Sequence, residues 1–225
     1  MTGLRKGLLV TLSFGATGAR GKPEDPQVIA LPDPVRSSAC SVEQALEGRR
    51  SVRAYAPEPL PLSAIGQLAW AAQGVTEAAT RFHAAPSAGA TFPLKVDLLV
   101  YGAAELDDGI YRYLPGEHAL TRRLAGDSRR AVYEAAFQQA AVLGVPVLML
   151  VSAVMARTAA HYGSRAERYV HMEAGHATQN VALQAVALGV GSVVIGTFDD
   201  AALTAAMHLS EGEQPLCLVP LGRLP

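Results

Sequence analysis

Cysteine is scarce in this sequence. The 225 residues include only Cys40 and Cys217, which lie far apart and belong to no C-x-x-C pair. Two thiols cannot form a disulfide framework or supply the ligands of a structural zinc site. We therefore expect a protein of a reducing compartment, or one that is indifferent to redox conditions.

Net charge and long hydrophobic runs are also lacking. The formal net charge is −1, so no overall basic field exists to attract nucleic acid or an anionic membrane. No apolar run approaches the ~20 residues needed to span a bilayer, and the longest run, at 145–154, suits a buried strand. Hydrophobic residues nevertheless make up 50% of the chain, which is enough for one globular domain.

The first 20 residues have some features of a weak secretory leader. Arg5 and Lys6 precede a short apolar stretch, and the small residues Thr17 and Ala19 follow it. The stretch is short and interrupted by polar residues, so we favour an uncleaved tail and a cytoplasmic protein. Export is the alternative if the leader is real.

Glycines near the amino terminus imitate a dinucleotide-binding turn. Gly15, Gly18 and Gly21 follow an apolar run, but such a turn must open a helix. Prolines follow instead, beginning at Pro23 and Pro26, and exclude that helix. We predict that residues 1–40 form a tail with a proline-rich linker or surface-crossing arm, and that 41–225 form a single domain.

Helical and strand patterns alternate irregularly after Ser41. The predicted helices cover 41–48, 62–74 with Ser63 as the N-cap, 128–143, 165–188 and 199–209. The predicted strands cover 95–102, a hairpin at 109–120, 146–154, 192–196 and 215–222. Regular βαβ spacing and internal repeats are absent, so the predicted class is α+β.

A cationic cluster follows the first predicted helix. Arg49, Arg50, Ser51 and Arg53 fall within five consecutive positions. Arginine forks and a serine hydroxyl match the oxygens of a phosphate, and a loop leaves backbone N–H groups free. A solvated or ion-paired surface is the alternative. The chain has no P-loop, so this cluster is the main candidate for holding a phosphorylated cofactor.

Five segments follow one another in a recognisable order and spacing: "RRSVRAYAPEPL", "LAWAAQGVT", "PSAGATFPL", "YGSRAERYVHMEAGHATQN" and "VVIGTFDD". Together they resemble the nitroreductase superfamily of flavin enzymes, and most closely its SagB/ThcOx-type dehydrogenase branch. The resemblance runs from about Ser41 to the C-terminus. It implies an FMN-binding α+β fold with a central, mostly antiparallel sheet flanked by helices. It also implies a homodimer with FMN at the subunit interface.

The resemblance assigns the cationic cluster to FMN. Arg49, Arg50 and Ser51 would hold its phosphate and ribityl chain. Arg53 would lie near the pyrimidine end of the flavin, where a fixed cation stabilises the negative charge of the reduced ring. Arg223 is the only candidate for a further phosphate-binding cation near the C-terminus.

Further residues are assigned to the flavin by the same resemblance. A turn would reach FMN from the other subunit, although an ordinary loop is the alternative; its residues are Pro86, Ser87, Ala88 and Gly89. Gln139 would face the flavin or else be a polar surface residue on a helix. Ile195 and Gly196 would lie against the flavin ring, where glycine lets the backbone approach closely.

The pair His161-Tyr162 stands where azoline-oxidising members of this branch carry Lys-Tyr. Tyrosine could donate or accept a proton, and histidine could serve as a base with a pKa near neutrality. A surface pair is the alternative. The missing lysine argues against oxidation of peptide heterocycles.

The segment with His171, Glu173 and His176 suggests a metal site. Residues five apart on a helix point about 140° apart, and the H-E-x-x-H order is absent. We therefore expect no metal here. In the family this helix packs at the dimer interface, which favours buried, hydrogen-bonded roles for Glu173, His176, Gln179 and Asn180.

These observations predict a stand-alone FMN-dependent oxidoreductase. NAD(P)H or an organic donor would give hydride to flavin N5 and leave, and a second small molecule such as a nitro or quinone acceptor would then enter the same pocket. A peptide dehydrogenase that converts azolines to azoles is one alternative. A non-catalytic flavin-binding protein is another.

Overall fold

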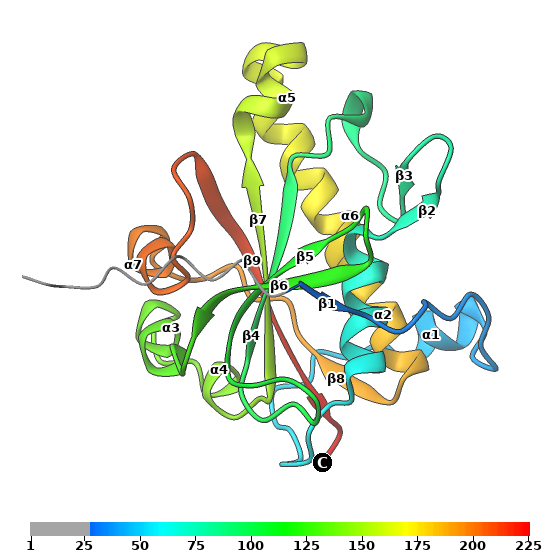
Figure 1. Ribbon diagram of the computed structural model, residues 1–225, viewed down its shortest axis with the longest axis vertical. Coiled ribbons are helices and arrows are strands. Elements are labelled where there is room, and N and C mark those ends of the chain that lie inside the picture. The colour runs from blue at the N-terminus through cyan, green and yellow to red at the C-terminus, as the bar shows by residue number, and fades with distance from the viewer. Residues whose placement is uncertain (1–27) are drawn as a thin grey trace, which may run out of the picture.

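A seven-stranded sheet divides the molecule in the computed structural model, which describes residues 28–225 (Figure 1). The predicted leader and the glycines at 15, 18 and 21 lie outside the described residues. The order is β1-β6-β5-β4-β7-β9-β8, and each neighbouring pair is antiparallel. The strands are β1 (Val28–Ala30), β4 (Leu94–Val100), β5 (Gly109–Leu114), β6 (Ala119–Ala125), β7 (Val147–Val154), β8 (Val190–Ser192) and β9 (Glu213–Arg223). The predicted α+β class with an antiparallel central sheet is confirmed.

Helices cover both faces of the sheet. One face carries α1 (Val42–Gly48), α2 (Leu62–Gln73) and α6 (Ala166–Ala187), and the other carries α3 (Arg129–Ala135), α4 (Ala140–Leu143) and α7 (Asp200–Ala206) (Figure 1). Helix α5 (Met155–Tyr162) continues from β7 beyond one end of the sheet. A separate two-stranded sheet contains β2 (Val75–Glu77) and β3 (Phe82–His83). No helix within residues 28–225 is both long and apolar enough to cross a membrane.

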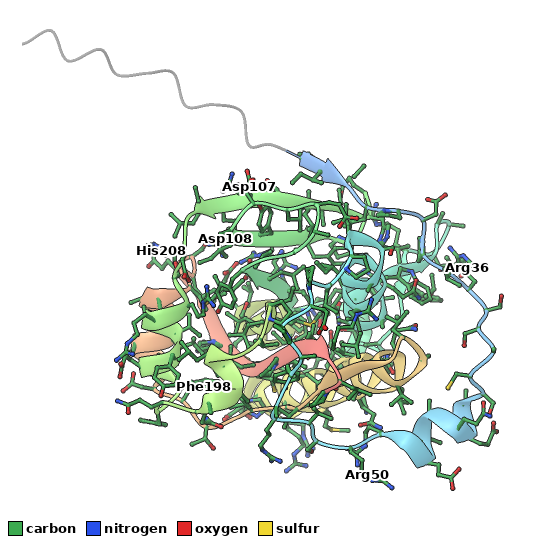
Figure 2. The ribbon with its side chains drawn as sticks, turned by 90° about the horizontal axis from the view of Figure 1, so that it is seen from below. Arg36, Arg50, Asp107, Asp108, Phe198 and His208 are labelled. Carbon is green, nitrogen blue, oxygen red and sulfur yellow. The ribbon has the colours of Figure 1, made fainter. Side chains whose placement is uncertain are left out.

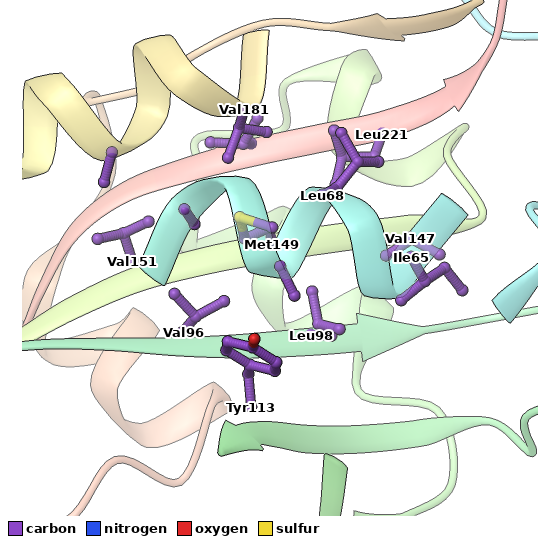
Figure 3. Close-up of a cluster of buried hydrophobic side chains, with 14 of the residues drawn as sticks. Ile65, Leu68, Val96, Leu98, Tyr113, Val147, Met149, Val151, Val181 and Leu221 are labelled. Atoms are coloured by element: carbon purple, nitrogen blue, oxygen red, sulfur yellow. The ribbon is translucent and has the colours of Figure 1, made fainter. Parts of the chain in front are cut away.

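Two hydrophobic cores hold these layers together. On the α2 and α6 side, Leu68 and Val181 pack over Met149 of β7 (Figure 3), and all three side chains are fully buried. The alternate residues Leu148 and Leu150 of β7 enter the core on the other side. A strand buried on both faces needs a continuous apolar run, which is the pattern seen at 145–154. Each fully buried leucine contributes about 1.5–3 kcal/mol.

The predicted helix at 128–143 is wrong as a single element. The chain leaves helical geometry at Phe137 and Gln138, whose φ values are 52° and 58°. Another segment supplies a hydrogen bond to the backbone at this break, since the Asp199 amide donates to the Ala135 carbonyl at 2.9 Å. Two short helices replace the long one, and Gln139 becomes the N-cap residue of α4 instead of a residue within a helix.

Two smaller boundaries also differ from the sequence predictions. Ser63 lies inside α2, because the helix begins at Leu62 with Pro61 as its N-cap and no capping side chain. The strand predicted at 192–196 is misplaced, because β8 covers Val190–Ser192 and overlaps the prediction only at Ser192. Ile195 still pairs with Leu218 of β9 as an isolated bridge.

The described part of the proline-rich arm runs along the outside of the sheet. Strand β1 pairs with β6, and Leu31 after it is buried in the core. The Val35 amide then donates to Oε1 of Gln67 on α2 at 2.8 Å. This segment supplies the edge strand of the sheet before Ser41 is reached.

Candidate functional site

The cationic loop begins where α1 ends. Ser41 and Gln44 form a capping box that fixes the start of this helix. At its other end, Arg49 turns into extended geometry with φ −61° and ψ 122°. The Val52 amide then donates to the Ser192 carbonyl at 2.9 Å, so the loop lies along β8.

The C-terminal strand borders the same loop. The Ala56 amide donates to the carbonyl of Arg223 at 3.1 Å. Gly222 of β9 allows this close approach, because a β-carbon there would lie 3.0 Å from Cβ of Tyr55. The fold therefore brings Arg223 next to the loop that carries Arg49–Arg53.

The arginines of this loop differ in what they contact. Arg50 points outward (Figure 2), and its guanidinium donates to the carbonyls of Glu47 and Arg49 at 2.7 and 2.8 Å. It thereby satisfies carbonyls at the end of α1, a structural role that the sequence did not indicate. The side chains of Arg49, Ser51 and Arg53 form no hydrogen bond or ion pair within residues 28–225. Those three are available to a ligand.

The predicted turn at Pro86–Gly89 is rigid. Oγ of Ser87 accepts a hydrogen bond from the Phe92 amide at 3.0 Å. Thr91 and Thr158 join the turn to α5 through their hydroxyls at 2.9 Å. Gly89 has a φ of 58°, in the left-handed region that favours glycine.

Tyr162 reaches this turn, whereas no such contact links His161 to it. A β-carbon on Gly89 would lie only 2.8 Å from the Tyr162 hydroxyl, so the two residues are in contact. The Tyr162 ring also packs edge-on against Tyr169, with centroids 5.0 Å apart. His161 is exposed and makes no side-chain hydrogen bond to the described residues. The two members of the predicted pair therefore have different surroundings.

Two parts of the predicted flavin site lie at opposite ends of the folded molecule. The Pro86–Gly89 turn is attached to α5, and the Arg49–Arg53 loop is attached to β9 close to the C-terminus. Figure 1 places α5 and the C-terminus at opposite ends of the molecule. One chain therefore does not bring these two parts together.

A third part of the predicted site lies around Gly196. Nε2 of Gln139 donates to the Thr197 carbonyl at 2.9 Å, which places Gln139 beside the 195–197 segment. The backbone of Ile195 is fixed by its bridge to β9. Gly196 is exposed, and a β-carbon on it would meet no atom within 4 Å. The surface over Gly196 is open to a group from outside the chain.

Glu173 has a buried carboxyl group. From the sequence alone, this residue was expected to have only a structural role. It is 2% exposed, and its Oε1 has no hydrogen-bond partner among the described residues. Burial raises the pKa of Glu173 to about 7, and a hydrogen bond from Ser87 opposes part of that shift. Its spacing from the buried residues Val170 and Ala177 was the available signal.

Replacing Glu173 with glutamine should change how stability depends on pH. Because the folded-state pKa is raised, the folded protein holds this proton more tightly, and that stabilisation is lost as pH rises from about 4.5 through about 7. Relative to wild type, Glu173→Gln should gain on the order of 2 kcal/mol between pH 5 and pH 8. Urea unfolding at both pH values measures this change.

Glu167→Gln is the matched control, because Glu167 is exposed on the same helix. Its stability relative to wild type should be the same at both pH values. A pH-independent difference for Glu173→Gln as well would contradict the raised pKa.

The remaining polar residues of α6 divide between surface and interior. Asn180 donates from Nδ2 to the Ala84 carbonyl at 3.1 Å, while His176 and Gln179 are exposed on the single chain. Within residues 28–225, no group of three or more His, Cys, Asp or Glu side chains is arranged to hold a metal ion.

Comparison with known proteins gives consistent matches over most of the chain. A family model described as "Nitroreductase family" matches residues 46–223. A protein of Methanocaldococcus jannaschii that bears a nitroreductase name is 38% identical over 199 residues, which cover 88% of this chain and 98% of that protein.

Solved structures agree with these matches. A crystal structure from Ralstonia eutropha, also named as a nitroreductase, has 28% identity and a TM-score of 0.78, and the alignment covers 98% of this chain and 96% of the other. A structure of a protein from Desulfovibrio desulfuricans in complex with FMN has 23% identity and a TM-score of 0.58, with coverages of 81% and 85%. The range matched by the family model contains every residue predicted to bind a cofactor or handle a proton.

Proposed function

Because the chain belongs to the nitroreductase family of oxidoreductases, we propose that it is an FMN-dependent enzyme. It would oxidise one small organic molecule, the donor, and then reduce a second, the acceptor. The motif order further supports the SagB/ThcOx-type branch. One observation carries the proposal: the loop after α1 presents Arg49, Ser51 and Arg53 without partners among the described residues. Such a set suits the phosphate and polar edge of a flavin.

The residues present fit FMN. Arg49, Ser51 and Arg223 would hold the phosphate, and Arg53 would face the polar end of the ring. Gly196 has open space above it, which a flat ring can approach. When bound, FMN supplies reversible two-electron transfer at its N5 position. The chain binds the cofactor, orients it and excludes water around it.

A homodimer is part of this proposal. The Pro86–Gly89 turn and the Arg49–Arg53 loop lie at opposite ends of one folded molecule. A second copy in a two-fold arrangement would bring its own turn to the loop of the first. The complete site would then contain residues from both chains.

Tyr162 is the best candidate for handling a proton. Its hydroxyl contacts Gly89 at the predicted flavin turn, and its side chain is 37% exposed, so a substrate can reach it.

NAD(P)H as electron donor, with a nitro or quinone acceptor, is the substrate class we propose. The absence of lysine at His161 disfavours the azoline alternative.

Tyr162→Phe should slow turnover and leave the cofactor bound. The substitution keeps the ring and removes the hydroxyl, and proton transfer by a positioned side chain contributes about 100-fold or more to a rate. Steady-state kinetics together with flavin content measure both effects. Tyr169→Phe is the control, because its ring packs on Tyr162. Equal rates for wild type and Tyr162→Phe would assign Tyr162 to the surface.

The absorbance spectrum of the purified protein tests the main proposal. A bound flavin spectrum, with FMN released on denaturation, is expected. Anaerobic titration with NADH and NADPH should then bleach the flavin, and acceptors should restore it. Oxidation of a peptide thiazoline without NAD(P)H would favour the azoline alternative. Bound FMN with no turnover for any donor or acceptor would favour a non-catalytic flavin protein.

A further inference from the structure

The structure has a cavity that is separate from the Arg49–Arg53 loop. Its volume is about 420 Å³, and residues of β3, β4, α5 and the β5–β6 hairpin line it. Small-molecule sites commonly have about 300–1,000 Å³. Leu94, Val96, Tyr113 and Leu114 form its apolar wall. The cavity is large enough for an organic molecule with one or two rings.

Positive charge dominates the polar part of this cavity. Arg81, Lys95, Arg112 and Arg157 all line it, against the single carboxylate of the exposed Glu117. Arg112 is neutralised by two carboxylates at 2.7 and 2.8 Å. The other three cations form no ion pair within residues 28–225. The excess charge is therefore suited to an anionic group.

The excess of positive charge in the cavity acts on Lys95. It is half-buried on β4, and burial lowers its pKa, followed by the positive charges of Arg157 and Arg112. The carboxylates of Glu213 and Asp97 oppose the shift only in part. A half-buried ammonium without a paired carboxylate costs free energy, and a bound anion would offset that cost.

Gln73 supplies an unused donor at the inner end of the cavity. It is 1% exposed, and its Oε1 lies 2.9 Å from Nδ1 of His83. Its Nε2 is buried and has no hydrogen-bond partner among the described residues. A buried amide donor is rarely left without a hydrogen-bond partner. An acceptor atom of a bound ligand would supply the missing partner of Gln73.

One wall of the cavity is flat and aromatic. His83 stacks on Phe92 with ring centroids 3.9 Å apart and an interplanar angle of 20°. Burial lowers the pKa of His83, and the positive charge of Arg81 adds to the effect, so both favour the neutral imidazole. A neutral stacked pair favours contact with another aromatic ring.

We propose that this cavity binds an aromatic carboxylate. The carboxylate lies among Lys95, Arg81 and Arg157, and the ring packs on the apolar wall near His83. The site is separate from the Arg49–Arg53 loop and does not depend on a bound cofactor. It adjoins the Pro86–Gly89 turn, because the amide of Phe92, a residue that lines the cavity, donates to Oγ of Ser87 in the turn.

Calorimetric titration of the purified full-length protein tests the proposal. The probes are 2-naphthoate, its neutral analogue 2-naphthamide, and inorganic phosphate, at constant ionic strength. 2-Naphthoate should bind at least about tenfold more tightly than either of the others, because only it has both a charge and a ring. Equal binding of naphthoate and naphthamide, equal binding of phosphate, or no binding of naphthoate overturns the proposal.

Single substitutions test whether naphthoate binds in this cavity. Lys95→Met keeps the apolar stem, and Arg81→Gln changes an exposed loop residue that cannot disturb the core. Each should weaken naphthoate binding about tenfold and leave naphthamide binding unchanged. Arg130→Gln, on the opposite face of the sheet, should have no effect. Unchanged naphthoate affinity in both cavity variants, or loss of flavin together with naphthoate, contradicts a separate anion site.

Discussion

Replacing Arg49 and Ser51 together with alanine is expected to release the flavin. Both side chains lack partners within residues 28–225, so their removal should disturb the fold little. A hydrogen bond to a charged group contributes about 1.5–3 kcal/mol, and the loss of two such bonds should weaken FMN binding about 100-fold or more. Flavin content after purification and fluorescence titration of the stripped protein measure the effect.

The control has the same residue types at the same spacing. Ser128 and Arg130 lie at the start of α3, on the opposite face of the sheet from α1. Their double alanine variant should retain FMN as wild type does. If the Arg49→Ala/Ser51→Ala protein also retains its flavin, the phosphate does not bind at this loop.

Asp97→Ala is expected to cause the largest loss of stability. Its carboxylate is fully buried on β4 and accepts from Nε and Nη2 of Arg112 at 2.7 and 2.8 Å, and from Arg123 at 3.2 Å. Removing one partner leaves the guanidinium groups under-compensated in a poorly solvated site. The expected cost is about 3–5 kcal/mol in the free energy of unfolding, measured by urea denaturation.

Asp107→Ala provides the comparison for this buried pair. Asp107 lies at the surface (Figure 2), where its side chain is 84% exposed and pairs with Arg122 at 3.3 Å. An exposed ion pair contributes less than about 1 kcal/mol. Similar losses for both variants would show that burial of Asp97 does not control its contribution.

Several elements could be predicted because their signals are local. Ser41 and the apolar spacing after it indicated α1, which has Ser41 as its N-cap. The pattern at 165–188 predicted α6 to within one residue at each end. The apolar run at 146–154, interrupted only by Ser152, predicted β7, which is buried on both faces. Each of these elements is favoured by the residues within it.

The helix predicted at 128–143 failed for a tertiary reason. Its sequence has helical periodicity throughout, yet the chain breaks at Phe137 and Gln138. The amides of Asp199 and Gln139 bond to carbonyls at the end of α3. A remote partner, Asp199, and a local one, Gln139, thus replace hydrogen bonds that a continuous helix would make.

The sequence by itself determined the fold class, most of the strands and the motifs that mark the family, because periodicity and turn chemistry act within each segment. Only the tertiary structure decided that the Arg49–Arg53 loop and the Pro86–Gly89 turn lie at opposite ends of the molecule. It also decided that Glu173 is buried without a full set of partners and that Lys95 shares a cavity with two other unpaired cations. Distances between remote segments and the solvation of a charge depend on how the elements pack, which no local pattern records.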